Sequence, residues 1–342
     1  MNVLVTGGTG FLGSALLPLL AAQGHHLRVL ARGEAAAAEA LGAEVVRAPL
    51  SDRTAVRRAL QGIDAVEHLA GQVAFDAKDP AALYELHVQG TRTLLEDAHA
   101  AGVRRFVLAS SSGTIAISRE ERVHTEDDPH PIAVVARWPY YLSKIYQEKT
   151  ALRFHRDTGL PVVVVNPSLL LGPGDARLSS TDVVFKFLAR RIPVLPGGGL
   201  SFVDVRDAAA CFAAALERGR AGERHLVGAA NMTFAEFFGR LSRLSGVAAP
   251  ALRLPSRATV AGAHLLERFH TWRGSEPPLA AEEVEMGEHF FWLDATKARR
   301  ELGFAPRDPQ ETLHETVAWL ERHVRANRGR TAAPTPRAAA RP

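Results

Sequence analysis

The N-terminal segment constrains the fold of this chain more than any other part of its sequence. Residues 1–6 are a short run of β-formers, Gly7-Gly-Thr-Gly-Phe-Leu-Gly13 follows directly, and an apolar, helix-forming segment begins at Ser14. A strand, a glycine turn and a helix in this order are typical of the front half of a dinucleotide-binding βαβ unit. The segment therefore predicts an α/β fold with a nucleotide site close to the N-terminus.

Each glycine of this turn has a role in such a site. Gly7 allows a tight turn out of the strand, Gly10 lets a pyrophosphate approach the backbone, and Gly13 lets helix and sheet pack closely. The N–H groups at the start of the helix, together with the helix dipole, form an anion site. A glycine turn without a ligand is the alternative, which the position between a strand and a helix disfavours.

Length and composition set further bounds. At 342 residues the chain exceeds the roughly 250–300 residues of a single core, so we expect one large domain and a smaller lobe. The net charge of +4 is small and the arginines are scattered, which argues against a nucleic-acid partner. Cys211 is the single cysteine, which excludes an internal disulfide and suits the cytoplasm; its alanine-rich surroundings predict a buried thiol. No apolar run approaches the ~20 residues of a membrane span and no signal peptide precedes the first strand, so no membrane partner is expected.

Short apolar runs alternate with helical patterns along the first half. Residues 80–101 and 139–158 are predicted as helices, and five further strands are predicted at residues 26–31, 44–48, 65–70, 105–109 and 161–166. This alternation indicates a Rossmann-type, doubly wound parallel sheet with helices on both faces. A ligand should then lie outside the carboxyl ends of the strands.

The pattern becomes irregular after Gly172-Pro-Gly174. We expect residues 1–172 to form mainly the dinucleotide-binding domain. Residues 173–325 should form mainly a smaller C-terminal substrate lobe, with some segments returning to the first domain. Residues 326–342 are rich in arginine, alanine and proline, which predicts a disordered tail.

Two further motifs favour an enzyme over a binding module. Tyr140 and Lys144 are four residues apart in a predicted helix, so both side chains lie on one face. An ammonium beside a phenol favours the phenolate and would bring the tyrosine pKa from about 10 towards neutrality. The run Ser110-Ser-Ser112 ends a predicted strand, where a hydroxyl could donate to a substrate carbonyl. A solvated helix face and a polar turn are the alternatives, which the order of these motifs behind the glycine turn disfavours.

Taken together, these motifs resemble the extended short-chain dehydrogenase/reductases, also called the NAD-dependent epimerase/dehydratase family. The resemblance covers about residues 1–325 and includes His68-Leu-Ala-Gly71, Asn166-Pro-Ser168, Phe202-Val-Asp-Val-Arg-Asp207 and Glu301-Leu-Gly-Phe304. Within the family the chain looks most similar to dihydroflavonol-4-reductase-like and hopanoid-associated sugar epimerase-like proteins. The resemblance implies that this chain is an NAD(P)-dependent oxidoreductase with a Rossmann fold.

The resemblance also implies roles for individual residues. Tyr140 matches the acid/base tyrosine, and Lys144 matches the lysine that holds the nicotinamide ribose and lowers the tyrosine pKa. Ser111 matches the carbonyl-binding serine, with Ser112 as the alternative. The resemblance also implies a set of cofactor-binding residues: Gly7, Thr9, Gly10, Phe11, Leu12, Gly13, Arg32, Leu50, Ala70, Gly71, Tyr140, Lys144, Pro167 and Ser168. Of these, Pro167 and Ser168 would lie beside the nicotinamide.

The chain departs from the family pattern at two positions. The family usually has Asn-Val-x-Gly-Thr on the long helix, where this chain has His87-Val-Gln-Gly-Thr91. His87 must therefore substitute for the asparagine, or the surroundings of the lysine are altered. The usual Gly-Asp-Leu after the third strand is Ala48-Pro-Leu50 here, so adenine recognition would fall to the backbone and Leu50.

One residue bears on the choice of cofactor. An acidic residue after the second strand would bind the ribose 2′-hydroxyl of NAD, whereas an arginine would accept the 2′-phosphate of NADP. Arg32 occupies this position, with Arg28 nearby, so NADP is favoured and NAD is the alternative. An Arg32 that merely faces solvent would carry no such preference.

Three functions of different classes fit these residues. NADPH-dependent reduction of a ketone or aldehyde is the leading prediction, partly because residues 169–171 and 194–200 are apolar. A (nucleotide-)sugar epimerase or dehydratase is the alternative, since arginines for a pyrophosphate are available in the second lobe: Arg177, Arg190, Arg191, Arg206, Arg253 and Arg257. A non-catalytic dinucleotide sensor is disfavoured by the serine, tyrosine and lysine set.

Other features predict structure more than chemistry. No metal-ligand spacing is present, so no metal is expected. Asp204 and Asp207 are predicted to cap the helix that follows them. The resemblance also allows a homodimer, since family members often pair through the helices predicted at residues 80–101 and 139–158.

Overall fold

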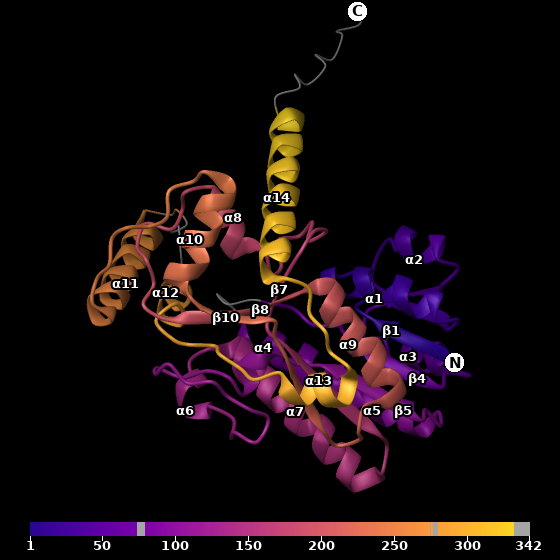
Figure 1. Cartoon of the computed structure of the whole chain (residues 1–342). Coiled ribbons are helices and arrows are strands. Elements are labelled where there is room, and N and C mark those ends of the chain that lie inside the picture. Colours follow the sequence, from indigo (N-terminus) through magenta and orange to yellow (C-terminus); the bar gives the residue numbers. More distant parts are fainter. Residues whose placement is uncertain (74–78, 274, 276–279, 332–342) are drawn as a thin grey trace, which may run out of the picture.

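A parallel sheet forms the centre of the larger domain (Figure 1). The computed structural model describes residues 1–73, 79–273, 275 and 280–331. In this part of the chain the main sheet has seven strands in the order β3-β2-β1-β4-β5-β6-β9, all parallel. The predicted Rossmann-type fold is confirmed, since the first six strands follow the order of a dinucleotide-binding sheet. The strands are β1 (Asn2–Thr6), β2 (His26–Ala31), β3 (Glu44–Arg47), β4 (Ala65–His68), β5 (Arg105–Ala109), β6 (Val162–Pro167) and β9 (Arg224–Val227).

Helices cover both faces of this sheet. On one face α1 (Phe11–Ala22) packs against α9 (Val205–Arg218), and on the other α3 (Arg53–Leu60), α5 (Gly90–Ala100) and α7 (Pro139–Thr158) lie side by side. Because side chains alternate along a strand, Val3 and Val5 join the core under α1 and α9, whereas Leu4 joins the opposite core. Shorter helices at the periphery are α2 (Ala36–Ala40), α6 (Ile132–Val135) and α13 (Thr296–Leu302), and a 3-10 turn, η2 (Ser112–Thr114), follows β5.

The segment predicted as one helix at residues 80–101 is interrupted. It consists of α4 (Pro80–Tyr84), a π-helical turn η1 (Glu85–Gln89) and α5. A π turn accommodates an extra residue in a helix and is frequent at functional sites. The buried residue His87 lies in this turn, which faces α7.

A smaller lobe forms around a three-stranded sheet in the order β10-β8-β7. β8 (Gly199–Asp204) pairs parallel with β7 (Leu169–Leu171) and antiparallel with β10 (Ala230–Thr233). Its core is rich in phenylalanine, including Phe187, Phe202, Phe237 and Phe238. The helices of this lobe are α8 (Asp182–Leu188), α10 (Phe234–Ser245), α11 (Ser256–Trp272), α12 (Ala281–Met286) and α14 (Pro309–Thr331).

The C-terminal helix α14 spans Pro309–Thr331, and residues 332–342 lie outside the described residues, so the predicted disordered tail at residues 326–342 stays a prediction. Leu313, Val317 and Leu320 bury one face of α14 in the smaller lobe. A helix nucleated by such packing can propagate through alanine and arginine, which are good helix formers.

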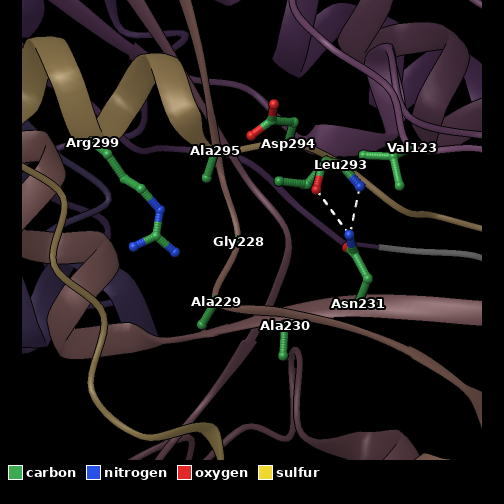
Figure 2. Close-up of a pocket in the computed structure, with 9 residues that line it drawn as sticks. All are labelled: Val123, Gly228, Ala229, Ala230, Asn231, Leu293, Asp294, Ala295 and Arg299. Atoms are coloured by element: carbon green, nitrogen blue, oxygen red, sulfur yellow. Dashed lines mark hydrogen bonds between the residues drawn. The ribbon is translucent and has the colours of Figure 1, made fainter.

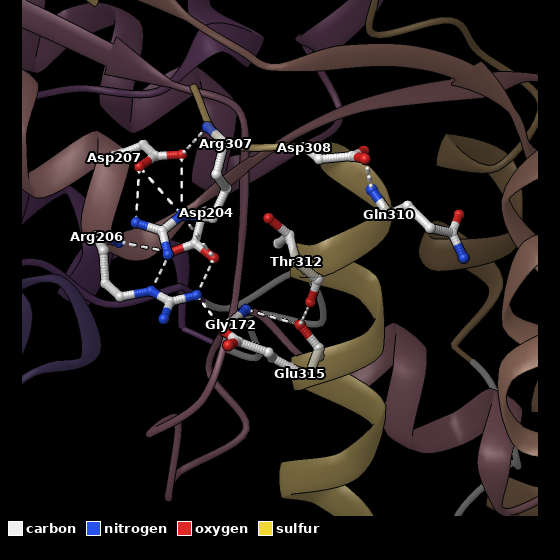
Figure 3. A network of polar contacts seen from close by, with 10 residues as sticks. Gly172, Asp204, Arg206, Asp207, Arg307, Asp308, Gln310, Thr312 and Glu315 are labelled. Atoms are coloured by element: carbon white, nitrogen blue, oxygen red, sulfur yellow. Dashed lines mark hydrogen bonds and ion pairs between the residues drawn. The ribbon is translucent and has the colours of Figure 1, made fainter. Parts of the chain in front are cut away.

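A polar network fastens α14 to the start of α9 (Figure 3). Asp204 caps α9 as predicted, with Oδ1 accepting from the Arg206 N–H at 2.9 Å, and its carboxylate also binds the Arg206 guanidinium. Asp207 instead accepts from the Arg307 backbone at 2.8 Å and from its guanidinium at 2.9 Å. Arg206 also pairs with Glu315 on α14. Within one turn of Glu315, the Thr316 hydroxyl accepts from the Gly172 N–H, which anchors the loop after β7.

Candidate active site

A cavity of about 1000 Å³ lies at the carboxyl ends of the central strands. Its walls come from the glycine turn after β1, the segment after β4, the serine run after β5, and Pro167 and Ser168 at the end of β6. The strand order reverses between β1 and β4, which is where a doubly wound sheet binds its ligand. The cavity therefore lies where the sequence analysis predicted a ligand, outside the carboxyl ends of the strands.

The glycine turn has the shape of a phosphate cradle. Gly7 has a positive φ of 75°, and a Cβ at Gly13 would lie only 2.5 Å from the Gly7 carbonyl oxygen, so neither position tolerates a side chain. The Gly10 N–H donates to the Gly7 oxygen at 2.9 Å, which closes the turn. Gly10 is also the N-cap of α1 and provides no side-chain cap. The first-turn N–H groups of α1 are thus suited to an anionic group such as a pyrophosphate.

The structure brings the three predicted catalytic side chains together on one wall of the cavity. Tyr140 and Lys144 come from the first turns of α7, and Ser111 lies directly after β5. The Ser111 side chain is hydrogen-bonded to Tyr140. The Lys144 ammonium donates to the Ala109 carbonyl at 2.9 Å and to Gln147 Oε1 at 2.9 Å.

Burial dominates the electrostatics of these groups. It raises the pKa of Tyr140 to about 12, against a smaller lowering by the Ser111 hydrogen bond. It lowers the pKa of Lys144 to about 8, against a smaller raising by Glu148. The predicted lowering of the Tyr140 pKa towards neutrality is therefore wrong for this structure. The reason is that burial of the phenol raises its pKa, while the Lys144 ammonium donates to Ala109 and Gln147.

A buried carboxylate supports the serine run from behind. Glu148 Oε2 accepts from the Ser110 hydroxyl at 2.7 Å and from the Asn166 amide at 2.8 Å, and Oε1 pairs with Arg224 at 3.3 Å. Glu148 lies one turn after Lys144 on α7, so the helix that carries the tyrosine and lysine also fixes the end of β5. Sequence reasoning missed this residue, although its i+4 spacing from Lys144 is a usable signal.

The structure defines the hydrogen-bond partners of His87, whose role the sequence left open. Its Nε2 accepts from the Gln72 N–H at 3.1 Å, so the proton of the neutral ring lies on Nδ1, 2.8 Å from the Ser143 hydroxyl. Ser143 Oγ in turn donates to the Tyr140 carbonyl at 2.7 Å. Burial, with the nearby charge of Lys144, lowers the pKa of His87 to about 2, which keeps the ring neutral. His87 thus joins the cavity segment after β4 to the first turn of α7.

A second buried chain of hydrogen bonds runs from the lysine to the first strand. Gln147 Nε2 donates to the Thr91 hydroxyl at 2.8 Å, and Thr91 Oγ1 lies 2.9 Å from His68 Nε2. His68 Nδ1 lies 2.7 Å from the Thr6 hydroxyl at the end of β1. Gln147 thus orients the lysine and links it to the first strand through this chain.

Most of the predicted cofactor residues line the cavity, and three do not. The lining includes Gly7, Thr9, Gly10, Phe11, Leu12, Gly13, Gly71, Ser111, Ser112, Tyr140, Lys144, Pro167 and Ser168. Ala70 contributes backbone that packs against Gly7, and the Leu50 side chain lies against Gly90 on α5. Arg32 is exposed just beyond β2. Arg28 is engaged elsewhere, with Glu44 at 2.7 Å and with two backbone carbonyls.

The far part of the cavity is mainly apolar and lies in the smaller lobe. Its apolar lining is Leu169, Leu170, Leu178, Val183, Ile192, Val194, Leu200, Phe234, Phe238, Leu254, Leu266, Val284, Met286 and Phe291. The Lys186 ammonium in this wall is neutralised by Asp182 at 2.8 Å and Glu283 at 2.7 Å. Of the six arginines considered for a pyrophosphate, only Arg177 is among the described lining residues. This part of the cavity suits a largely neutral, apolar ligand.

A smaller pocket of about 270 Å³ lies between β10 and the segment before α13 (Figure 2). The Asn231 amide donates to the Leu293 carbonyl at 2.9 Å, and its oxygen accepts from the Leu293 N–H at 3.1 Å. Asp294 accepts from the N–H of Thr296, and the Arg299 guanidinium lies 5.5 Å from the centre of the Phe304 ring. The polar groups of this pocket serve the local fold. Across the described ranges, no group of three or more metal-ligating side chains that could hold a metal ion is found.

Comparison with known proteins establishes the family. Residues 3–228 match the model of the NAD dependent epimerase/dehydratase family. The chain therefore belongs to this family, the extended short-chain dehydrogenase/reductases, whose members bind NAD(P) and act on small molecules. It is an NAD(P)-dependent oxidoreductase in this broad sense.

Individual relatives are similar over nearly the whole chain. "Putative dihydroflavonol 4-reductase" of Synechocystis sp. is 31% identical over 93% of this chain and 94% of its own length. "Sterol demethylase protein B" of Methylococcus capsulatus is 31% identical over 94% of this chain and 98% of its own length. The crystal structure of gox2253 superposes with a TM-score of 0.82 at 32% identity, covering 95% of this chain and 99% of that one.

No helix in the described ranges is both long enough and apolar enough to span a lipid bilayer.

Proposed function

We propose that this protein reduces a lipophilic ketone or aldehyde with NADPH. The observation that carries the proposal is the position of Ser111, Tyr140 and Lys144 within a single cavity. On one side of them lies the glycine turn, with the features of a pyrophosphate site. On the other side lies the apolar part of the cavity in the smaller lobe. The dinucleotide would supply the hydride to the carbonyl carbon of a substrate held there.

The protonation states of the side chains suit reduction. A pKa of about 12 keeps the Tyr140 phenol protonated at neutral pH, so Oη can donate its proton to the oxygen that develops negative charge. The Ser111 hydroxyl donates a hydrogen bond to the same oxygen. Lys144, with a pKa near 8, is mostly an ammonium at pH 7 and holds the ribose beside the tyrosine. Glu148 and His87 act as positioning residues, through Ser110 and Ser143 respectively.

Arg32 supports NADPH as the cofactor. Its exposed guanidinium follows β2, next to the strand that carries the glycine turn. A guanidinium there pairs with the 2′-phosphate of NADP, whereas NAD-specific sites of this type have a carboxylate at the end of this strand. Arg28 supports neither cofactor, because its side chain is engaged with Glu44 and backbone carbonyls.

A sugar epimerase or dehydratase is the second candidate function. The family itself supports it, and Arg177 provides one cation in the cavity lining. A nucleoside diphosphate carries two or more negative charges, while Asp182 and Glu283 outnumber Lys186 on the same wall. The charges of the wall therefore favour a neutral substrate.

The experiment that tests the proposal is a substrate screen. Purified protein is incubated with NADPH and a panel of aromatic ketones, aldehydes and sterol-like ketones, and loss of NADPH absorbance is followed. We expect carbonyl-dependent consumption of NADPH. No consumption across the panel, together with NAD⁺ released from the denatured protein, would replace the reductase with the epimerase.

A further inference from the structure

The helix α11 lies at the edge of the smaller lobe (Figure 1). It has an exposed apolar stripe along one side. Leu265, Phe269 and Trp272 are 73%, 46% and 81% exposed. They are spaced i, i+4 and i+7, so they lie along one face of the helix. Large apolar side chains scattered singly over a surface are ordinary, but three along one helix face mark an interaction surface.

The face of the same helix that adjoins this stripe forms a wall of the active-site cavity. Ala258, Gly262 and Leu266 are spaced i, i+4 and i+8 and line the cavity. Leu266 is next to Leu265 in sequence, lines the cavity and is itself 43% exposed. The apolar surface is therefore continuous from the outer stripe to the cavity lining.

Cationic side chains flank the stripe. Arg257 and Arg268 are eleven residues apart, three helical turns, and lie beside the stripe on the side away from the cavity. The Arg273 guanidinium lies 5.5 Å from the centre of the Phe269 ring. The single acidic residue of α11, Glu267, lies about half a turn away from the stripe. An apolar stripe with tryptophan and flanking arginines is typical of helices that lie in the interface of an anionic membrane.

A second copy of the chain fits this surface less well. The three side chains offer on the order of 400 Å², whereas each partner of a standard interface contributes about 800 Å². A two-fold contact through the stripe would also bring the arginines of both copies to one interface. An anionic lipid surface can bury the apolar stripe and pair with the arginines at the same time.

We propose that α11 seats the protein on the surface of an anionic lipid bilayer, with Leu265, Phe269 and Trp272 in the headgroup region. The cavity mouth beside Leu266 would then face the bilayer. The purpose of this contact, direct uptake of an apolar substrate, rests on the proposed reductase function. The contact itself does not, since it involves no catalytic residue.

Vesicle sedimentation tests the contact without substrate or cofactor. The full chain is mixed with vesicles of phosphatidylcholine alone, or of phosphatidylcholine and phosphatidylglycerol in equal parts. We expect binding to the anionic vesicles. Leu265→Ser, Phe269→Ser and Trp272→Ser combined should weaken it by at least about tenfold, and Arg257→Glu with Arg268→Glu by roughly tenfold. Val123→Ser removes a 50% exposed apolar side chain outside α11 and should leave binding unchanged.

Two further measurements keep the result interpretable. Melting temperature shows whether the triple variant is folded. Quenching of tryptophan fluorescence by brominated lipid should occur in the wild type and fall in Trp272→Phe, which changes one exposed side chain only. Three results would overturn the proposal: no binding to either vesicle, equal binding by the folded triple variant, or self-association of the wild type that the triple variant abolishes. Reductase activity is measured separately, so failure of either proposal leaves the other to be judged on its own.

Discussion

Among single residues, Tyr140 has the most direct part in the proposed reaction. Tyr140→Phe removes the proton donor while keeping the buried ring, so we expect kcat to fall by roughly 10²–10⁴-fold with little change in NADPH affinity. Steady-state kinetics and a cofactor titration check both parts. Tyr141→Phe is the matched control, because Tyr141 also lines the cavity but lies three residues from Lys144 instead of four. An activity of Tyr140→Phe within about threefold of wild type would remove the tyrosine from the mechanism.

Arg32 decides the cofactor preference in this account. Arg32→Asp removes a partner of the 2′-phosphate and supplies an acceptor for a 2′-hydroxyl, so preference should shift from NADPH towards NADH. Titration of both cofactors into wild type and variant measures the shift. Arg28→Ala is the control, since that guanidinium already binds Glu44 and backbone carbonyls and should not change the preference. A wild type that prefers NADH would show that Arg32 does not contact the ribose.

Glu67 is buried, and its effect on the stability of the folded state depends on pH. It lies on β4 between Val5 and Val107, and within the described part of the chain neither carboxylate oxygen has a hydrogen-bond partner. Burial raises its pKa well above 4.5. Because the folded-state pKa is raised, the contribution of Glu67 to the free energy of unfolding is fully present below pH 4.5. This contribution is lost as the pH rises towards the folded-state pKa.

The replacement Glu67→Gln removes this titration. Relative to wild type, the variant should therefore gain up to about 1.4 kcal/mol of unfolding free energy for each pH unit above 4.5, until the folded pKa is reached. Denaturant unfolding of both proteins at pH 5, 6 and 7 measures the difference. A difference that stays constant across these values would mean that Glu67 does not titrate abnormally.

At the level of elements, we expect the π turn η1 to link the cofactor half of the cavity to α7. His87→Ala should lower the melting temperature and weaken NADPH binding, because the Gln72 N–H and the Ser143 hydroxyl both lose a partner. His87→Asn can still accept from the backbone and should recover part of both losses. Thermal melts and NADPH titrations separate the two effects. If the alanine variant binds NADPH like wild type, the turn has no part in shaping the cofactor half of the cavity.

Local sequence patterns predicted the regular elements and missed the interruptions. Short apolar runs identified all five further strands of the first half to within two residues at each end, and α7 was predicted with its observed bounds. The π turn was missed because it is defined by its i→i+5 backbone hydrogen bonds, which the apolar pattern of a sequence does not report. The irregular composition of the second half also gave no bounds for α14, whose apolar residues Leu313, Val317 and Leu320 pack in the smaller lobe.

For the whole molecule, the sequence predicted which residues surround the site better than it predicted their chemistry. Tyr140 and Lys144 were identified from their spacing on a predicted helix, and Ser111 was chosen within the serine run from the family resemblance. All three line the cavity. The high pKa of Tyr140 and the engagement of Arg28 were not predictable, because both depend on contacts between residues far apart in the chain. The same holds for Glu148, whose partners come from β5, β6 and β9.

In the proposed reaction hydride passes once, from an exchangeable NADPH to a carbonyl substrate. The direct test uses NADPH carrying deuterium at the transferred position, together with the best substrate from the screen. Net reduction predicts one NADPH consumed for each product molecule and deuterium on the former carbonyl carbon. Product formed without deuterium and without net loss of NADPH would contradict the account, because an epimerase returns the same hydride to its substrate.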